Sequence, residues 1–197
     1  YGQEELANDY YSKGQFEKAL TIYQDLEKKN KRNTTYKLKI IDIYRQLEQL
    51  DQAETYLTTL VNTTNSPVFL VELGYNFELK SDTLKAREYY DLANQKLTIT
   101  PSYAYNLARA YENHSLLDMA VFVYNKAMKI DSNLNFNIQL ARIYGEQGDI
   151  EKMFNSYLDF IHINNSYTDH TKRAMSGFIS EDSENEGNQI LKRILLK

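Results

Sequence analysis

The stretch that decides the fold is residues 101–128, PSYAYNLARAYENHSLLDMAVFVYNKAM. Within each half, small, leucine and aromatic residues stand three or four positions apart, as on one face of a helix. Thr100-Pro101 places an N-cap residue before a proline at the first helical position, which favours a helix start there. The stretch therefore predicts two consecutive helices. The residues that carry this pattern are Leu107, Ala108 and Tyr111 in the first half, and Ala120, Tyr124 and Ala127 in the second.

The same pattern recurs along the chain at alternating spacings of 34 and 33 residues. Four independent columns keep one register over five units, which predicts a repeat protein. The columns are Ala19, Ala53, Ala86, Ala120 and Met153; Tyr23, Leu57, Tyr90, Tyr124 and Tyr157; Tyr10, Tyr44, Phe77, Tyr111 and Tyr144; and Leu26, Leu60, Ala93, Ala127 and Phe160.

The first unit shows how each repeat is built. Residues 16–26 place their apolar side chains on one helix face, and residues 6–10 do the same for a preceding helix. Gly14 stands between them, where glycine takes the left-handed conformation that ends a helix. In the fifth unit Gly148 holds the equivalent place, and Asp149 is positioned to cap the next helix. Each unit is therefore predicted to be a helix–turn–helix of roughly 34 residues.

Composition narrows the function classes. The 197 residues are 42% apolar and 25% charged with a net charge of −4, which is typical of a folded globular chain. Seven glycines and two prolines argue against a turn-rich all-β protein. The absence of cysteine excludes a disulfide scaffold, a thiolate nucleophile and a cysteine metal site. A sequence pI near 5.5 argues against nucleic acid as the partner.

These columns resemble the tetratricopeptide repeat family, whose units carry a leucine, a small residue and a tyrosine in the first helix. An alanine, an aromatic residue and a second alanine follow in the second helix. The family's tryptophan is missing here. The resemblance implies an all-α fold, a right-handed superhelical solenoid, with five repeats in residues 1–165. The expected repeats are 1–33, 34–66, 67–100, 101–133 and 134–165.

The tail, residues 166–197, fits the columns less well. Its first helix is expected from Tyr167 to about Ser180, followed by the acidic turn 181–186 and a final helix with an apolar stripe. Two interpretations stay open, a divergent sixth repeat or capping helices. The acidic turn is interpreted as a solvent-facing loop in preference to a binding motif.

In this family the first helices line a concave groove that holds an extended peptide or a partner helix. The resemblance therefore implies a peptide-binding groove with mixed charge and several tyrosines. Its residues fall in three columns. The first includes Asn8 and Arg109, the second includes Tyr11 and Arg45, and the third, which is mainly apolar, includes Tyr105. The predicted groove residues are Asn8, Tyr11, Asp42, Arg45, Tyr75, Glu78, Tyr105, Arg109 and Arg142.

Arg109 and Arg142 occupy equivalent sites in adjacent repeats and are expected about one helix-packing distance apart. One interpretation is that the pair holds carboxylates of a partner through bidentate contacts. The alternative is that each arginine pairs with a nearby acid such as Glu112 or Glu146. The carboxylate clamp of the chaperone-binding branch is not matched, because only Asn8 fits its pattern.

No catalytic, cofactor-binding or metal site is predicted. His114, His162 and His170 are too scattered for a metal motif, and no phosphate-binding glycine loop occurs. The basic run at residues 28–32 is interpreted as a solvated helix end, and no apolar run approaches the roughly 18 residues that span a bilayer. The expected function is a non-enzymatic protein–protein interaction scaffold with a protein or peptide partner.

The alternative function is a self-assembling structural module. The array has no spare polar cap at its ends, which favours a homodimer through the exposed terminal repeats or a place in a larger multi-repeat protein of a bacterial envelope complex. The chain begins at Tyr1 and not at methionine, which fits a trimmed chain or the removal of an export signal. Its composition resembles exported repeat proteins of AT-rich bacteria, so a periplasmic location is expected, with the cytoplasm as the alternative.

Overall fold

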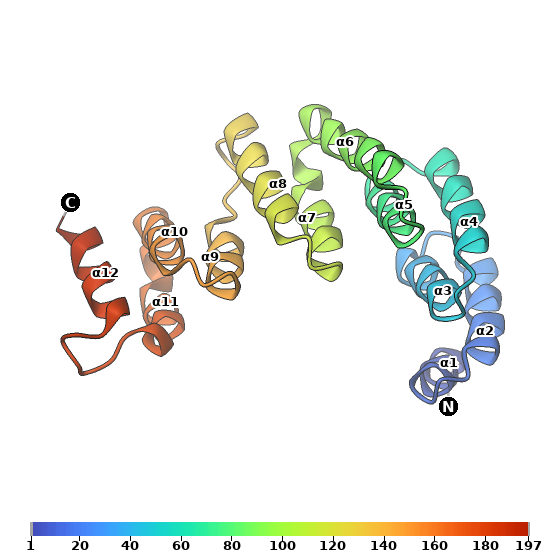
Figure 1. The fold of residues 1–197 in the computed structure, drawn as a ribbon, viewed down its shortest axis with the longest axis horizontal. Helices are drawn as coiled ribbons and strands as arrows, with labels where there is room; N and C mark the ends of the chain where they lie inside the picture. The colour runs from blue at the N-terminus through green and yellow to red at the C-terminus, as the bar shows by residue number, and fades with distance from the viewer. Residues whose placement is uncertain (1, 197) are drawn as a thin grey trace. The chain divides into compact units, whose positions relative to one another are not determined.

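The computed structural model describes residues 2–196; Tyr1, on which the export hypothesis partly rests, and Lys197 lie outside this range. Within it the chain forms α-helices, three short 3-10 helices and no strand (Figure 1). The all-α fold predicted from the columns is confirmed. The α-helices are α1 (Gln3–Ser12), α2 (Phe16–Lys29), α3 (Thr34–Gln46), α4 (Leu50–Thr63), α5 (Val68–Leu79), α6 (Thr83–Ile99), α7 (Ala104–Asn113), α8 (Leu117–Ile130), α9 (Asn137–Glu146), α10 (Ile150–Ile163), α11 (Thr168–Met175) and α12 (Glu186–Leu195).

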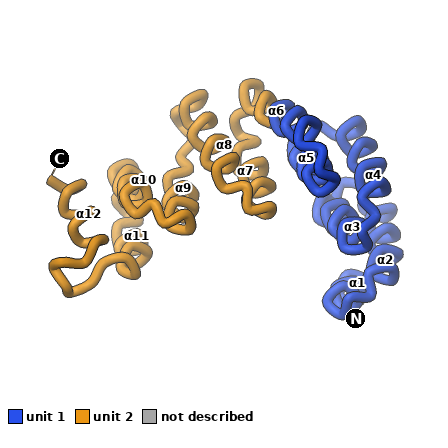
Figure 2. The backbone as a smooth tube through the Cα atoms, in the orientation of Figure 1, with its two compact units in different colours: residues 1–93 blue, residues 94–197 orange. Residues whose placement is uncertain are grey.

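The chain divides into two compact units, residues 1–93 and residues 94–197 (Figure 2). Unit 1 holds α1 to α5 and most of α6, and unit 2 holds the end of α6 and the helices from α7 to α12. The division falls inside α6, at the second helix of the third predicted repeat. Each predicted repeat contains two helices, a first helix and a second helix, joined by a short turn.

The turn inside each repeat places one residue in the left-handed region. Its φ is +71° at Gly14, +57° at Glu48, +63° at Ser81, +59° at Ser115 and +77° at Gly148. These positions keep the 34- and 33-residue spacing of the columns, although only the two glycines mark it in the sequence. The next residue donates its backbone N–H to the carbonyl of the aromatic column, which closes the first helix. The distances are 2.9 Å to Tyr10, 2.8 Å to Tyr44, 2.9 Å to Phe77, 3.0 Å to Tyr111 and 2.9 Å to Tyr144.

The small-residue column is what lets the helices approach. Ala19, Ala53, Ala86 and Ala120 are all 0–1% exposed. Gly74, on the first helix of its repeat, shows the same tight approach, because a Cβ added there would lie 2.5 Å from Cε1 of Tyr90. Replacing such residues with larger ones therefore forces neighbouring helices apart.

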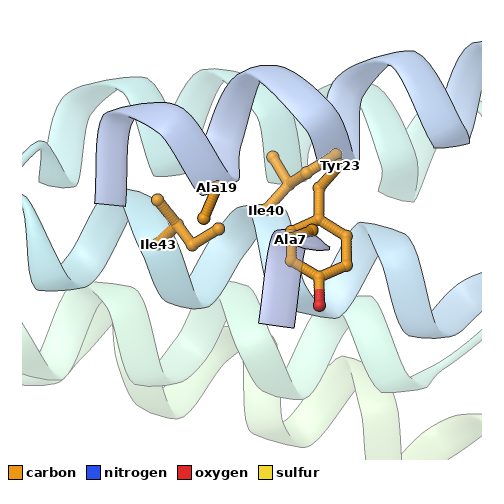
Figure 3. Packing of buried hydrophobic residues seen from close by; sticks show 5 residues of the cluster. All are labelled: Ala7, Ala19, Tyr23, Ile40 and Ile43. Carbon is orange, nitrogen blue, oxygen red and sulfur yellow. The ribbon is translucent and has the colours of Figure 1, made fainter. Parts of the chain in front are cut away.

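The core of unit 1 shows how the columns pack. Ala7, Ala19, Tyr23, Ile40 and Ile43 form one buried cluster, contributed by α1, α2 and α3 (Figure 3). The Tyr23 ring lies beside Ala7, and its hydroxyl points away from the cluster (Figure 3). The large side chain thus fills the space that the alanines leave open, as expected for residues that join one repeat to the next.

The tail of unit 2 packs on the last helix pair. A cluster of Ala141, Met153, Phe154 and Met175 is buried, with apolar side chains of α12 packed against it. The first tail helix, α11, is shorter than expected, because it runs from Thr168 to Met175 and a 3-10 turn follows. The acidic turn is held in place by the Asn188 side chain, whose Nδ2 donates to the carbonyls of Ser180 and Asp182 at 2.7 Å each.

Candidate functional site

The predicted groove residues lie on the first helices of the repeats, α1, α3 and α5 in unit 1 and α7 and α9 in unit 2. One column directly follows the buried first-helix positions Ala7, Ile41, Gly74, Ala108 and Ala141. Because successive helix residues are about 100° apart, this column lies at the border of the buried face. Its members are Asn8, Asp42, Tyr75, Arg109 and Arg142.

In unit 1 the predicted groove residues of α1 and α3 form hydrogen bonds that connect neighbouring helices. The Tyr11 hydroxyl donates to Asp42 Oδ2 at 2.5 Å, and Lys39 Nζ lies 4.5 Å from the centroid of the Tyr11 ring. Burial, together with the hydrogen bond to the Asp42 carboxylate, raises the pKa of Tyr11 to about 12. The Tyr23 hydroxyl donates to Asn8 Oδ1 at 2.6 Å. Asn8, Tyr11 and Asp42 therefore hold neighbouring helices together.

Arg45 and Glu72 form a buried ion pair between α3 and α5. The Arg45 Nη1 atom lies 2.7 Å from Glu72 Oε2, and Nη2 donates to the backbone carbonyl of Glu72 at 2.6 Å. Only 9% and 5% of the two side chains are exposed. The guanidinium also lies 5.0 Å from the ring centroid of Tyr75. Arg45 is thus engaged within the protein, and Glu78, half-buried near the end of α5, has no ion pair in the described part of the chain.

Unit 2 contains a pocket of about 360 Å³ that runs along α7 and reaches the carboxyl-terminal half of α9. It brings together three predicted groove residues, namely Tyr105, Arg109 and Arg142. Its remaining side chains come from the ends of α7 and α9 and the start of α8. We call this site the α7–α9 pocket; it is lined by Tyr105, Arg109, Glu112, Asn113, Leu117, Arg142 and Glu146.

Arg142 is held between two acids of this pocket. Its Nη2 donates to Glu112 in a short hydrogen bond, and its Nη1 donates to Glu146 Oε1 at 2.9 Å. Glu112 also accepts from the Tyr124 hydroxyl at 3.3 Å. Burial and the nearby Glu112 carboxylate raise the pKa of Tyr124 above its usual value. Arg142 therefore pairs with nearby acids, as one of the two interpretations expected.

Arg109 differs from Arg142. It is exposed, and its guanidinium lies 5.9 Å from the ring centroid of Tyr105, one turn earlier on the same helix. Tyr105 is itself 45% exposed. Among residues 2–196 no carboxylate lies within ion-pair distance of Arg109. Of the two arginines, Arg109 is therefore the one whose guanidinium forms no ion pair within residues 2–196.

The sequence did not single out Glu72 as the partner of Arg45. A signal was present, because Glu72 is the one charged residue in the otherwise apolar run VFLVELG at residues 68–74. A charge inside such a run is buried, and a buried charge needs a partner. Asn113 and Leu117 of the α7–α9 pocket also went unpredicted, because neither belongs to a groove column.

The described part of the chain shows no group of three or more His, Asp or Glu side chains placed to hold a metal ion. None of the helices between residues 2 and 196 has the length and apolarity to cross a bilayer.

Comparison with known families identifies the repeat. Residues 101–134 match the tetratricopeptide repeat family. These are the residues of η1 (Pro101–Tyr103), α7 and α8, and the same columns and turns recur in the other helix pairs. Residues 101–134 are a tetratricopeptide repeat. The tetratricopeptide fold generally acts as a non-catalytic module for protein–protein interaction.

No curated protein matches the sequence. Among solved structures, a thermophilic tetratricopeptide repeat protein of Thermus thermophilus is similar at 17% identity, with 88% of this chain and 96% of that chain covered and a TM-score of 0.45. BtubC from P. vanneervenii is similar at 18% identity, covering 90% and 81% with a TM-score of 0.44. YrrB, described as having an unusual peptide-binding site, is similar at 16% identity, covering 87% and 90% with a TM-score of 0.41. Likeness at this level of identity concerns the fold and not the ligand.

Proposed function

We propose that this chain is a non-enzymatic scaffold that binds an extended segment or a helix of a partner protein on the face formed by α7 and α9. The observation that carries the proposal is the α7–α9 pocket, which is open and lined by predicted groove residues from two adjacent repeats. An exposed aromatic ring, Tyr105, supplies apolar contact area, and an available guanidinium, Arg109, supplies hydrogen-bond donors. Aromatic and arginine side chains are the types enriched at binding hot spots.

A photo-cross-linking amino acid placed at Tyr105 tests this proposal. Phe122, on α8 of the same unit, is the matched control, because it is an aromatic residue of similar exposure, 47% against 45%. The cross-linker is activated in cells of the source organism, and the attached segment is identified by mass spectrometry. We expect one partner segment to be attached at Tyr105 and not at Phe122. Attachment of a partner at Phe122 without attachment at Tyr105 would contradict the proposal.

A second candidate function is self-assembly through the terminal helices, and an apolar hollow at the last helix favours it. Ile179, Leu191, Leu195 and Leu196 line this hollow, and the last two are 64% and 77% exposed. The last turn of α12 is basic, whereas the first turn of α1 is acidic and its last turn carries no basic residue. These charges favour a second copy of this chain joined end to end, as a homodimer or within a larger envelope assembly.

Light scattering of wild-type protein and of a Leu195→Glu/Leu196→Glu variant separates this candidate from a monomeric scaffold. Because both side chains are exposed, the substitutions leave the fold intact. Self-assembly predicts a dimeric or larger wild-type species that the variant reduces to the monomer. A monomeric wild-type protein at high concentration would contradict it.

A further inference from the structure

We propose that the α7–α9 pocket recognises an acidic side chain, a glutamate or an aspartate, of the partner segment, with Arg109 as the residue that holds its carboxylate. This inference rests on the proposed function, because it assigns the chemistry of the ligand to the same face. It adds what the groove geometry alone does not give, which is the charge of the bound side chain and the kind of residue beside it.

Arg109 is distinguished by comparison with the other members of its column. Asn8, Asp42 and Arg142 each use the polar group of the side chain in a hydrogen bond, and the ring of Tyr75 faces a guanidinium. Arg109 alone contacts only an aromatic ring, at 5.9 Å, within the described chain. The internal contacts are Asn8 with Tyr23, Asp42 with Tyr11, Tyr75 with Arg45, and Arg142 with Glu112 and Glu146.

The geometry of the side chain suits a carboxylate. A guanidinium presents a planar fork of donors that matches the two oxygens of a carboxylate. The ring centroid of Tyr105 lies 5.9 Å from the guanidinium, which is within the range of a cation–π contact and leaves the hydrogen-bond donors of Arg109 free for a ligand.

The surroundings of Arg109 limit how much negative charge its ligand can carry. Arg142 is paired with two carboxylates, Glu112 and Glu146, so this group carries an excess negative charge, and the carboxyl-terminal turns of α7 and α9, where the helix dipole is negative, also line the pocket. A phosphate group carries between one and a half and two charges near neutral pH, so these groups repel it more strongly than they repel a carboxylate. Of these two anions, the carboxylate is therefore the one that Arg109 holds against less repulsion.

A side chain fits the pocket better than a chain terminus. A glutamate carries its carboxylate on two methylene groups, so the main chain of the partner stays at the rim while the carboxylate reaches Arg109. An adjacent apolar side chain then packs on the exposed ring of Tyr105 and on Leu117, which also lines the pocket. The expected recognition element is therefore an acidic residue next to an apolar one in an extended segment.

The test is an NMR titration of the Arg109 Nε–Hε resonance with four short peptides. N-acetyl-Leu-Glu-amide carries the side-chain carboxylate, N-acetyl-Leu-Gln-amide carries none, N-acetyl-Leu-Gln with a free terminus carries only the terminal carboxylate, and N-acetyl-Leu-phosphoserine-amide carries the phosphate. We expect the Glu peptide to bind about tenfold more tightly than each of the other three.

Two variants complete the experiment. Arg109→Gln removes the guanidinium and is expected to abolish the preference for the Glu peptide over the Gln amide, measured on backbone resonances of α7. Arg87→Gln, at an exposed arginine of α6 in unit 1, is the matched control and is expected to keep it. Equal binding of the two amides to wild-type protein, or a preference unaffected by Arg109→Gln, overturns the proposal. Tighter binding of the free terminus or of the phosphoserine peptide also overturns it.

The outcome is separable from that of the proposed function. Attachment of a partner at Tyr105 without discrimination among the peptides leaves the scaffold proposal standing and removes the acidic ligand. Discrimination among the peptides without any attachment at Tyr105 removes the proposed partner face and leaves the carboxylate preference of Arg109.

Discussion

The two units use the same repeat, but they differ in what their groove columns leave available. In unit 1 the predicted groove residue Arg45 is buried in an ion pair with Glu72. In unit 2 Arg109 is exposed and lines an open pocket, and no carboxylate among residues 2–196 lies within ion-pair distance of it. A groove position in a repeat protein therefore does not by itself make a side chain available for binding. Whether a side chain is available depends on its neighbours one repeat away.

The largest expected effect concerns the buried pair of unit 1. Glu72→Ala leaves the Arg45 guanidinium buried without its carboxylate, so we expect a loss of about 3–5 kcal/mol in the free energy of unfolding, measured by urea denaturation. Glu146→Gln in unit 2 is the matched variant. It removes an ion pair whose two side chains are nearly half exposed, and a loss below about 1 kcal/mol is expected.

Equal losses in these two variants would contradict the contrast between the units. A second measurement protects the interpretation if Glu72→Ala fails to fold. The double variant Arg45→Met/Glu72→Leu replaces the pair by apolar side chains of similar size and is expected to recover most of the lost stability.

The packing columns, unlike the ion pairs, should behave alike in both units. Ala53→Leu in unit 1 and Ala120→Leu in unit 2 each insert a large side chain at a position that is fully buried. We expect each to lower the free energy of unfolding by about 1–3 kcal/mol, because the helices cannot separate without cost. Thermal unfolding provides the measurement, with Lys129→Leu at an exposed position of α8 as the control. No loss at either alanine would show that the register of the repeats is wrong.

The turns give a smaller effect of the opposite sign. Glu48 in unit 1 and Ser115 in unit 2 adopt φ values of +57° and +59°, which side chains with a Cβ disfavour. Glu48→Gly and Ser115→Gly are each expected to stabilise the protein by about 0.5–1 kcal/mol, and Gly148→Ala to destabilise it by a similar amount. Urea denaturation measures all three. Destabilisation by both glycine substitutions would contradict the left-handed turn.

The smallest effect is a titration in unit 1. The folded pKa of Tyr11 is raised from 10.0 to about 12, so its neutral form is favoured by folding. The contribution of Tyr11 to stability is therefore complete below about pH 10 and is lost as the pH rises towards 12. In an NMR titration of the tyrosine rings, Asp42→Asn is expected to lower the pKa of Tyr11, because the carboxylate acceptor is removed. An unchanged pKa in that variant would show that the hydrogen bond does not form.

Most of the fold was predictable, because the alanine and aromatic columns encode helix packing through residue size. Ala19 and Ala120 are small where helices approach, and Tyr23 is large where space remains. The left-handed turns were only partly predictable. Gly14 and Gly148 mark two of them, whereas Glu48, Ser81 and Ser115 adopt the same conformation without a glycine, since the hydrogen bonds of the turn outweigh the local strain.

The candidate site was less predictable than the fold. The family pattern gave the positions of Arg45, Arg109 and Arg142, but it did not give their partners. An arginine looks the same in sequence whether a carboxylate 27 residues away neutralises it, as Glu72 does for Arg45, or none is near. The distinction depends on burial and rotamers, which the spacing of the columns does not encode.

The most direct test of this contrast is a single NMR experiment that follows the Nε–Hε resonances of Arg45 and Arg109 while N-acetyl-Leu-Glu-amide is added. We expect a saturable shift of the Arg109 resonance and an unchanged Arg45 resonance, because Arg45 is paired with Glu72 whereas no carboxylate among residues 2–196 lies within ion-pair distance of Arg109. A shift of Arg45 equal to or larger than that of Arg109 would contradict it.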